Sequence, residues 1–475
     1  MTALGLEYYF EATDVEGLKA RKPPFPGVYS IHIATSGVTN LNAQPSGTEQ
    51  TAYRLISVPL DLDDKSPKAV LEDELGPYNI KKWRFYEFLA DQTYAEFPNT
   101  SEMTSGKAFW FIVKEPGKRI STGAGKTNLT SEPYVIPLHE RWNYIANPFN
   151  FPTFAVDTLS NGNSFMLFSF DGKWSDPVEP KNIELQPFEG YAVFSASACS
   201  MFVNPYRSSS LNNLAKEKTV VDKREILWSI RILAQCQEAR DDNNVLKVIP
   251  GASQHWDKMD YPEPPVIGEY VSVYFPHPEW ERLVSKYCTD ARPQSSDGEI
   301  WDFEVTTNIR DQVKLTFEGL ETLPQNFEAW LVDKELKISQ NLGEPNPYIV
   351  HGLVENHPKR LKLVVGNHDF VLEKQIEFQT IPSSYELSQN FPNPFNPTTT
   401  IRYGLPKAER VILKVFNLLG EEIVTLANDE QQAAGYHVAI WDGRNKDGII
   451  VTSGIYVYRL LTGSFSMTKK MALVK

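Results

Sequence analysis

Three prolines within six residues, Pro392, Pro394 and Pro397, constrain the fold of this chain more than any other feature. Each proline fixes φ, lacks an N–H donor and moves the preceding residue out of the helical region. The segment 391–396 is therefore predicted to be an extended, non-helical strap. It leads directly into a run of residues with strand character.

Alternating apolar and polar residues after the strap predict short, half-buried strands. The alternation runs through Ile401–Leu405 and Val411–Asn417, and four further apolar segments follow between glycine-containing turns. These further segments are residues 423–426, 437–441, 455–461 and 467–474. Six or seven such strands predict a small antiparallel β-sandwich over residues 385–475.

The order of motifs in residues 385–475 resembles the C-terminal sorting domain of the type IX (Por) secretion system. That domain has an immunoglobulin-like fold similar to the flagellar hook-capping protein. Five segments carry the resemblance, in this order: LSQNFPNPFNPTTTIRY, VFNLLGEEIVTL, GYHVAIWDGRNKDG, SGIYVYRL and KKMALVK. An ordinary sandwich domain behind a proline-rich linker is the alternative interpretation of the same residues.

The resemblance implies that a Gram-negative bacterium of the Bacteroidota or a neighbouring phylum exports the chain across its outer membrane. The protein would then be secreted or held at the outer-membrane surface. The implied partners are the type IX translocon and, as a candidate anchor, a surface glycan or lipopolysaccharide. In that family the domain is often cleaved during attachment or release.

The resemblance places the sorting signal in the strap and in the last two strands. Its residues are Phe391, Pro392, Asn393, Pro394, Phe395, Asn396, Pro397, Gly454, Tyr456, Lys469 and Lys470. Because the cargo folds before export, the translocon is expected to recognise a folded surface. We expect that surface to be the final strand, Met467–Lys475, with its lysine pair.

The composition favours an extracellular, all-β protein of three or four domains. Aromatic residues make up 12% of the chain and prolines number 33, which favours many short strands and proline-marked turns. Residues 385–475 hold 10 Lys/Arg and 8 Asp/Glu, whereas the rest holds 37 and 52. This acidic remainder argues against a nucleic-acid partner.

Three widely spaced cysteines, Cys199, Cys236 and Cys288, predict neither a disulfide framework nor a zinc site. No stretch of 18 apolar residues predicts a membrane-spanning helix. The residues after Met1 lack the basic and apolar regions of a signal peptide. We therefore expect the chain to be the C-terminal piece of a longer polypeptide, or to have a start assigned too late.

Tandem antiparallel β-sandwiches are predicted before the terminal domain. Residues 1–40 are predicted to be a remnant of a fibronectin type III or Ig-like domain, and residues 40–50 and 212–223 to be linkers. Residues 225–378 are predicted to form a β-sandwich. Residues 52–205 are predicted to form an internally duplicated sandwich.

Three pairs of segments indicate the duplication in residues 52–205. The pairs are 53–60 with 142–149, 83–88 with 165–170, and 105–110 with 189–194. Each copy would contribute a strand, an aromatic hairpin and a glycine-led strand. One helix is expected at Pro67–Leu75, because Gly76 and Pro77 end an amphipathic segment there.

No catalytic motif stands out, so we expect a protein that is not an enzyme. The eight histidines form no HExxH pair, and neither a GxSxG motif nor a Cys with a nearby His occurs. The sequence Gly123-Ala-Gly-Lys-Thr127 lacks the first glycine of a P-loop, because Ile120 occupies that position. A β-turn is the better interpretation of this segment.

Two weaker patterns suggest ligands. Asp241, Asp242, Asp257 and Asp260 provide oxygen atoms for a structural calcium ion, although solvated turns explain them as well. Four tryptophans in the duplicated domain could form a carbohydrate platform or pack in a core. These tryptophans are Trp83, Trp110, Trp142 and Trp174.

The sequence thus predicts the non-catalytic C-terminal region of a secreted or surface-attached multidomain protein, closed by a type IX sorting domain. Two alternatives remain open. One is a carbohydrate-binding or adhesive module in residues 52–205. The other is an accessory region of a peptidase or glycoside hydrolase whose catalytic domain lies upstream.

Overall fold

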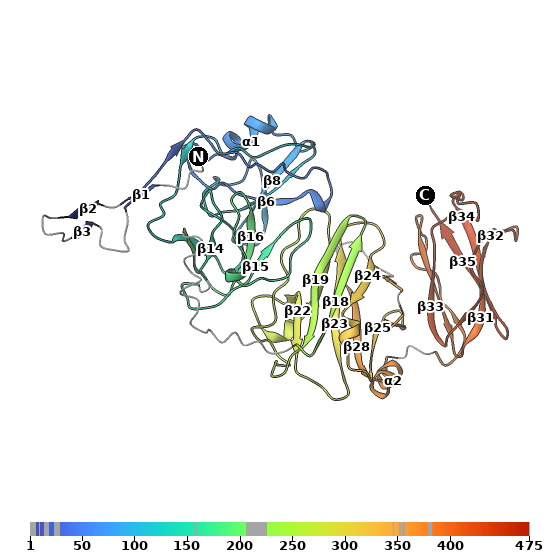
Figure 1. The fold of residues 1–475 in the computed structure, drawn as a ribbon. Helices are drawn as coiled ribbons and strands as arrows, with labels where there is room; N and C mark the ends of the chain where they lie inside the picture. Colours follow the sequence, from blue (N-terminus) through green and yellow to red (C-terminus); the bar gives the residue numbers. More distant parts are fainter. Residues whose placement is uncertain are drawn as a thin grey trace.

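The computed structural model describes residues 6–8, 10–13, 19–22, 29–156, 159–205, 226–344, 346–350, 353, 357–378 and 382–474. Over these residues the fold consists mainly of strands in antiparallel sheets, which follow one another along the chain (Figure 1). This arrangement confirms the predicted all-β class with tandem β-sandwiches. The segment 212–223, expected to be a linker, lies outside the described residues.

The N-terminal segment forms two short ladders before it joins the first large body of the fold. Strand β1 (Leu6–Tyr8) pairs with β4 (Tyr29–Ile31), and β2 (Phe10–Thr13) pairs with β3 (Lys19–Lys22). Strand β5 (Ala34–Thr35) then pairs with β11 (Gly125–Lys126), which also pairs with β7 (Asp61–Leu62).

Residues 40–50 are not a free linker. The N–H groups of Asn40 and Gly47 donate to the carbonyl oxygens of Ile120 and Val113, at 2.8 and 3.0 Å. The side chain of Gln50 is buried and accepts a hydrogen bond from the N–H of Arg240, at 3.0 Å. Polar composition suggested a linker here, but these backbone hydrogen bonds fix the segment along the domain.

Two sheets in residues 52–205 share one strand order. The first sheet is β6 (Arg54–Ile56), β10 (Phe109–Val113), β8 (Trp83–Phe88) and β9 (Tyr94–Glu96), in that order. The second is β13 (Arg141–Ala146), β16 (Gly190–Ser195) and β15 (Leu167–Ser169). A third sheet of this region is β12 (Tyr134–Leu138), β17 (Cys199–Asn204) and β14 (Phe154–Ala155).

Hydrogen bonds between the first two sheets are nearly symmetric. The N–H of Ser57 donates to the carbonyl of Phe188 at 3.0 Å, and the N–H of Ala146 donates to the carbonyl of Gly106 at 3.0 Å. Ser57, Ala146 and Gly106 lie within the paired segments that the sequence singled out, and Phe188 immediately precedes the segment 189–194. The observed sheet order and this reciprocal bonding are what two packed copies of one unit would produce.

The predicted helix is confirmed with its boundaries, α1 (Pro67–Leu75). Ser66 caps it, since its hydroxyl oxygen accepts a hydrogen bond from the N–H of Ala69 at 3.2 Å. Proline at the first helical position and Gly76 after the last turn complete the helix signals.

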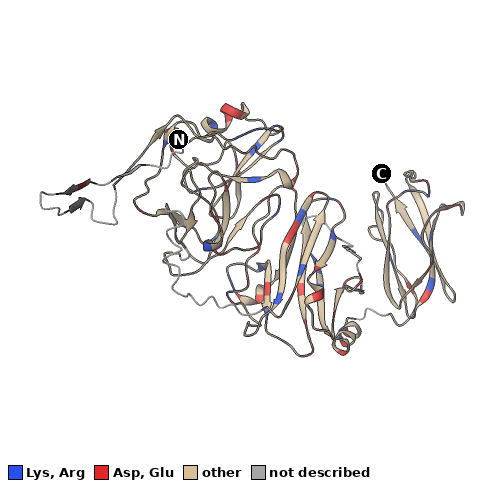
Figure 2. Cartoon of the chain, in the orientation of Figure 1, with Lys and Arg blue, Asp and Glu red and all other residues tan. Residues whose placement is uncertain are grey.

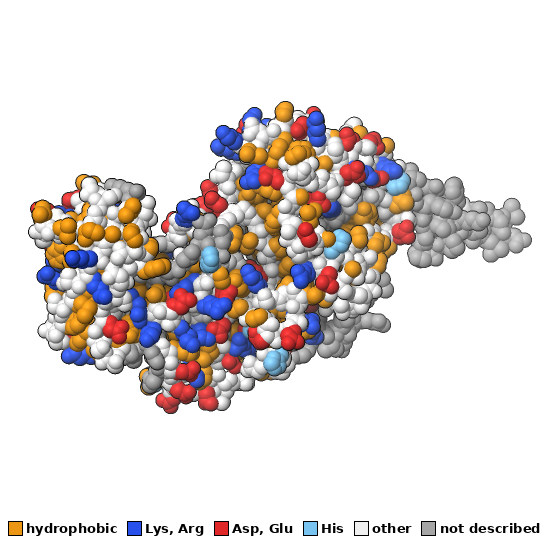
Figure 3. Space-filling view, turned by 180° about the vertical axis from the view of Figure 1, so that it is seen from behind, with side chains coloured by type: hydrophobic (Ala, Val, Ile, Leu, Met, Phe, Trp, Pro, Cys, Tyr) orange, Lys and Arg blue, Asp and Glu red, His pale blue; other side chains and the backbone are white. Residues whose placement is uncertain are grey.

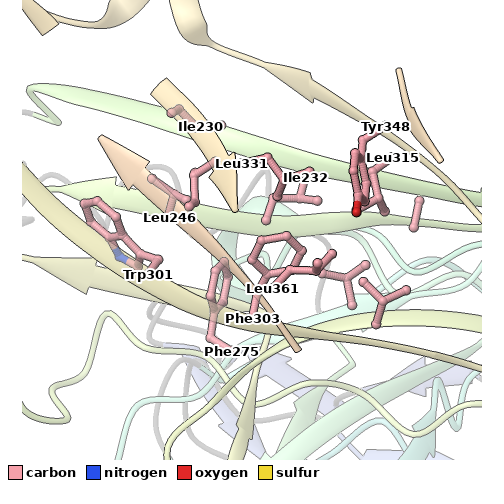
Figure 4. Packing of buried hydrophobic residues seen from close by; sticks show 14 of the residues in the cluster. Ile230, Ile232, Leu246, Phe275, Trp301, Phe303, Leu315, Leu331, Tyr348 and Leu361 are labelled. Atoms are coloured by element: carbon pink, nitrogen blue, oxygen red, sulfur yellow. The ribbon is translucent and has the colours of Figure 1, made fainter. Parts of the chain in front are cut away.

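The central body is a sandwich of a five-stranded and a six-stranded sheet. The first sheet contains, in order, β22 (Thr289–Arg292), β19 (Ala239–Val248), β18 (Trp228–Cys236), β24 (Lys314–Glu318) and β27 (Tyr348–Ile349). The second contains β21 (Lys286–Tyr287), β20 (Val271–Pro276), β23 (Gly298–Thr307), β28 (Lys359–Asn367), β25 (Phe327–Asp333) and β26 (Ile338–Asn341). Buried apolar side chains from both sheets, among them Ile232, Phe303 and Leu361, meet in one core (Figure 4). A helix that the sequence analysis did not predict, α2 (His368–Glu377), follows β28.

The terminal body is a seven-stranded sandwich and the smallest of the three (Figure 1). One sheet is β29 (Glu386–Leu387), β30 (Thr399–Leu405) and β33 (Gly435–Trp441). The other is β32 (Glu422–Gln432), β31 (Glu409–Phe416), β34 (Gly454–Thr462) and β35 (Ser466–Leu473). Arg402 connects this sandwich to the central one, because its Nε donates to the carbonyl of Leu336.

Candidate functional site

The proline strap lies against the edge of the last strand. The N–H of Phe395 donates to the carbonyl of Ala472, and the N–H of Val474 donates to the carbonyl of Phe395, both at 3.0 Å. The side-chain oxygen of Asn393 accepts a hydrogen bond from the N–H of Ala472 at 2.9 Å. Strand β35 is an edge strand, so the strap covers the end of an otherwise open sheet edge.

A buried polar group fixes the start of the strap. The hydroxyl of Tyr458 on β34 accepts a hydrogen bond from the N–H of Asn390 at 2.9 Å and donates to the carbonyl of Ser388 at 2.7 Å. Burial raises the pKa of Tyr458 to about 12, so the hydroxyl keeps its proton, and can donate, well into the alkaline range. The Asn390 amide then donates to the hydroxyl oxygen of Thr399 at 2.8 Å. Sequence reasoning did not assign roles to these residues, because no local pattern marks the contact.

The side chains of the strap divide into one buried residue and several exposed ones. Phe395 is 2% exposed and packs against Trp441, with 5.5 Å between the ring centroids. Phe391 is 65% exposed, although its backbone forms a bridge with Thr400. The remaining strap residues Pro392, Asn393, Pro394, Asn396 and Pro397 are also exposed. Phe395 therefore anchors the strap, whereas the other side chains form a surface.

The two signal residues predicted in β34 have different surroundings. Tyr456 is buried, stacks edge-on against Trp441 at 5.1 Å, and donates a hydrogen bond to the carbonyl of Thr452 at 2.7 Å. Gly454 is exposed, and a Cβ at this position would meet no atom within 4 Å. Packing explains why residue 456 is a tyrosine, but no neighbouring atom requires a glycine at residue 454.

The lysine pair lies on the same edge strand that the strap covers. Lys470 is exposed, Lys469 is half-buried, and neither forms an ion pair with any residue that the structure describes. The amide of Gln389 donates to the carbonyl of Lys470 at 2.6 Å, which brings the strap next to this lysine. The structure thus brings together the strap and the lysine pair, two segments of the chain that lie far apart in sequence.

Several apolar side chains are exposed on the terminal sandwich, most of them in loops. The exposed apolar residues include Leu418, Leu419, Ile449, Ile450 and Ile455. On the terminal lobe, Figure 3 shows mainly hydrophobic and basic side chains with few acidic ones. On the strands of the central sandwich, by contrast, both signs of charge occur (Figure 2).

The four aspartates predicted as calcium ligands fall into two pairs, Asp241 with Asp242 and Asp257 with Asp260. Asp241 and Asp242 lie within strand β19 rather than in a turn, and the Asp241 carboxylate accepts the N–H of Val273 at 2.6 Å. The Asp260 carboxylate accepts the N–H groups of Ala291 and Asp257, both at 2.8 Å.

Burial raises the pKa of both Asp241 and Asp260 to about 7. Over the described part of the chain, no group of three or more His, Cys, Asp or Glu residues could hold a metal ion. The calcium hypothesis therefore finds no support in this geometry.

The tryptophans considered for a carbohydrate platform are core residues. Trp83, Trp110, Trp142 and Trp174 are between 0% and 8% exposed. Trp110 of β10 packs against residues of the second sheet region, with its ring centroid 5.6 Å from that of Tyr144 and 4.8 Å from that of Phe170. The prediction that these four side chains form a carbohydrate platform is therefore wrong, because buried rings cannot stack on a sugar.

Fold and site together define a chain of tandem β-sandwiches with a strapped, immunoglobulin-like terminal domain. No known family matches the sequence, and no curated protein does either. Among the described residues, no helix is long and apolar enough to cross a membrane.

Two solved structures resemble parts of the chain. PorZ of Porphyromonas gingivalis, described as an essential bacterial surface component of the type IX secretion system, is 18% identical, with a TM-score of 0.15. The match covers 24% of this chain and 14% of PorZ. Dimeric latent PorU from Porphyromonas gingivalis is 12% identical with a TM-score of 0.18, over 89% of this chain and 29% of PorU. The chain thus spans less than a third of either protein, and at these TM-scores neither likeness supports an inference about function.

Proposed function

We propose that residues 385–475 act as a type IX sorting signal at the C-terminal end of a secreted or surface-attached protein of a Gram-negative bacterium. Support comes from the five sequence motifs that resemble this domain, together with one structural observation. The strap and the last strand, which are 79 residues apart at the Asn393–Ala472 contact, form a single surface. The remaining sandwiches would be non-catalytic cargo or spacers.

The proposed mechanism is recognition of a folded surface by the translocon. The strap holds the end of β35 in place, so the exposed Phe391 and Lys470 present a fixed apolar and basic pattern. Because a folded domain is read, recognition should depend on side chains that do not stabilise the fold. Cleavage near residue 384, just before β29, would separate the cargo from its signal.

Charge reversal at the lysine pair tests this mechanism. The chain, fused behind an inner-membrane signal peptide, is expressed in a Bacteroidota host with an active type IX system. We expect K469E/K470E to accumulate in the periplasm while keeping its protease resistance. The matched control K407E/K446E reverses two exposed lysines of the same domain and should be exported normally. Normal export of K469E/K470E would show that the translocon does not read this pair.

A further inference from the structure

A lysine and an aspartate are buried side by side in the central sandwich. Lys359 begins strand β28, and Asp333 ends the neighbouring strand β25. The Nζ of Lys359 lies 2.9 Å from the Oδ2 of Asp333, and the two side chains are 3% and 0% exposed. Burial removes the hydration of both charges, and their mutual attraction often fails to offset that cost. A neutral amide in place of the two ions would carry no such cost.

The register of the sheet directs both side chains into the hydrophobic core. Strands β25 and β28 pair antiparallel, with Leu331 opposite Leu363. Side chains an even number of residues apart in a strand share a face, so Asp333 lies on the face of Leu331 and Lys359 on the face of Leu363. Both leucines belong to the core cluster, which Tyr348 joins from the opposite sheet (Figure 4). Each strand is hydrogen-bonded on its two sides, which holds the two reactive groups together.

The two oxygens of the Asp333 carboxyl group have different partners. Oδ1 accepts a hydrogen bond from the N–H of Leu336 at 3.0 Å. Oδ2 faces the amine of Lys359 and accepts a hydrogen bond from the Tyr348 hydroxyl at 3.4 Å. A backbone N–H stabilises the negative charge that develops on an oxygen when a nucleophile adds to its carbon. Oδ1 is therefore placed to become an amide oxygen, and Oδ2 is placed to leave.

A second carboxylate contacts the same amine. The Oε2 of Glu335 lies 2.6 Å from the Nζ of Lys359, and the Glu335 side chain is 62% exposed. A carboxylate at hydrogen-bond distance from an amine can take its proton as a general base and return that proton to a leaving group. The three side chains thus provide a nucleophile, an acyl group and a proton carrier.

We propose that Lys359 and Asp333 form an intramolecular isopeptide bond once the chain has folded. Glu335 first moves a proton from the Lys359 ammonium group to Oδ2 of Asp333, which leaves a neutral amine and a carboxylic acid. The lone pair of Nζ then forms a bond to Cγ of Asp333, and Oδ1 takes the negative charge. Glu335 carries a second proton from the nitrogen to the Oδ2 hydroxyl. The C–O bond breaks with its electron pair, the Oδ1 carbonyl re-forms, and one water molecule leaves.

The bond would join β25 to β28 and close a covalent loop over residues 333–359. No oxidant, cofactor or second substrate enters the balance of this reaction. A crosslink of this kind stabilises a domain mainly by restricting the unfolded chain. The site lies in the central sandwich, so it is independent of the sorting function proposed for residues 385–475.

The mass of the unmodified chain tests the proposal directly. The folded chain, purified and then denatured for mass spectrometry, should weigh one water molecule less than its sequence requires. Trypsin should not cut after Lys359, because that amine is acylated. A branched peptide should then join residues 315–334 to residues 338–360, since the cleavage sites that bound these segments stay intact. A full sequence mass with two separate peptides would overturn the proposal.

Two variants and a matched control test the reacting groups. K359M and D333A each remove one of them, so each variant should have its full sequence mass. The control is K362M, because Lys362 lies in the same strand and pairs with Asp302, whose side chain is 58% exposed. This control should lose one water molecule as the unmodified chain does. Loss of water from K359M or D333A would place the reaction elsewhere and refute the site.

Refolding kinetics test the role of Glu335. The chain is isolated unfolded from inclusion bodies, where it should have its full sequence mass, and its mass is followed after refolding begins. E335Q should lose water at least about a hundredfold more slowly than the unmodified chain, because it lacks the general base. Equal rates in the two proteins would exclude Glu335 as the proton carrier.

Discussion

Replacement of Phe395 by alanine should unfold the strap and loosen the edge of the terminal sandwich. The side chain is 2% exposed and belongs to a core cluster with Trp441 and Leu473. Truncation of a buried phenylalanine costs about 3–5 kcal/mol, from lost burial and the cavity left behind. The two backbone hydrogen bonds between Phe395 and β35 would weaken as well.

Hydrogen exchange with peptide-resolved mass spectrometry measures this change locally. A loss of about 3–5 kcal/mol corresponds to roughly a hundredfold to several thousandfold faster exchange of the β34 and β35 amides. The matched control is F391A, because Phe391 is 65% exposed and should change stability by less than about 0.5 kcal/mol. Unchanged exchange in F395A, or equal effects of both variants, would refute the assignment of Phe395 as the anchor.

Three further predictions follow from other parts of the structure. Y458F removes the hydroxyl that bonds the backbone of Ser388 and Asn390, so it should destabilise the terminal domain by about 1–3 kcal/mol in the same exchange assay; a loss below about 0.5 kcal/mol would contradict this role. For Asp241, the pKa of about 7 in the folded state lies above its ordinary value of 3.8, so the folded chain binds a proton that the unfolded chain has lost. The free energy of unfolding should therefore fall as pH rises from about 4 to 7 and then level off. In urea unfolding, D241N should reduce this decline by roughly 2–4 kcal/mol. Identical pH profiles of the two proteins would exclude the effect. In thermal melting, G190A should destabilise the chain by about 1–3 kcal/mol through overpacking, because a Cβ would meet those of Ala108 and Leu55 at 2.4 and 2.8 Å. G454A, where a Cβ would meet no atom within 4 Å, should have a smaller effect on the same melting curve.

The two helices show where local sequence signals suffice. Helix α1 could be predicted because Ser66, Pro67 and Gly76 mark both ends. Helix α2 was missed, although the Asn367 side chain caps it by accepting the N–H of Phe370 at 2.9 Å. The helix begins directly after β28, and the last two residues of that strand, Gly366 and Asn367, pair with neighbouring strands, so the strand end and the helix cap coincide.

Strand β19 shows how tertiary contacts can override composition. Asp241, Asp242, Asn243 and Asn244 favour a turn by their local preferences. They form a strand because β18 and β22 pair with β19 on its two sides, and because side chains of β19 are buried against the neighbouring sheet. A sequence alone does not reveal such partners, so local preferences predicted a turn where the structure has a strand.

The terminal sandwich could be predicted in its strands but not in its assembly. Period-two alternation located the strands, since one face of each is buried. The contact between the strap and β35 joins residues 79 apart, and local patterns do not encode such pairings. The sequence named Phe395 and Lys470 as signal residues without showing that one is buried and the other exposed.

Export of the unmodified chain tests the central proposal most directly. The chain is expressed behind a signal peptide in a Bacteroidota host and in a strain that lacks the type IX translocon, and both are fractionated and analysed by mass spectrometry. We predict protein on the surface or in the medium of the first strain, with residues after about 384 removed, and intact protein in the periplasm of the second. The same distribution in both strains would contradict the sorting function.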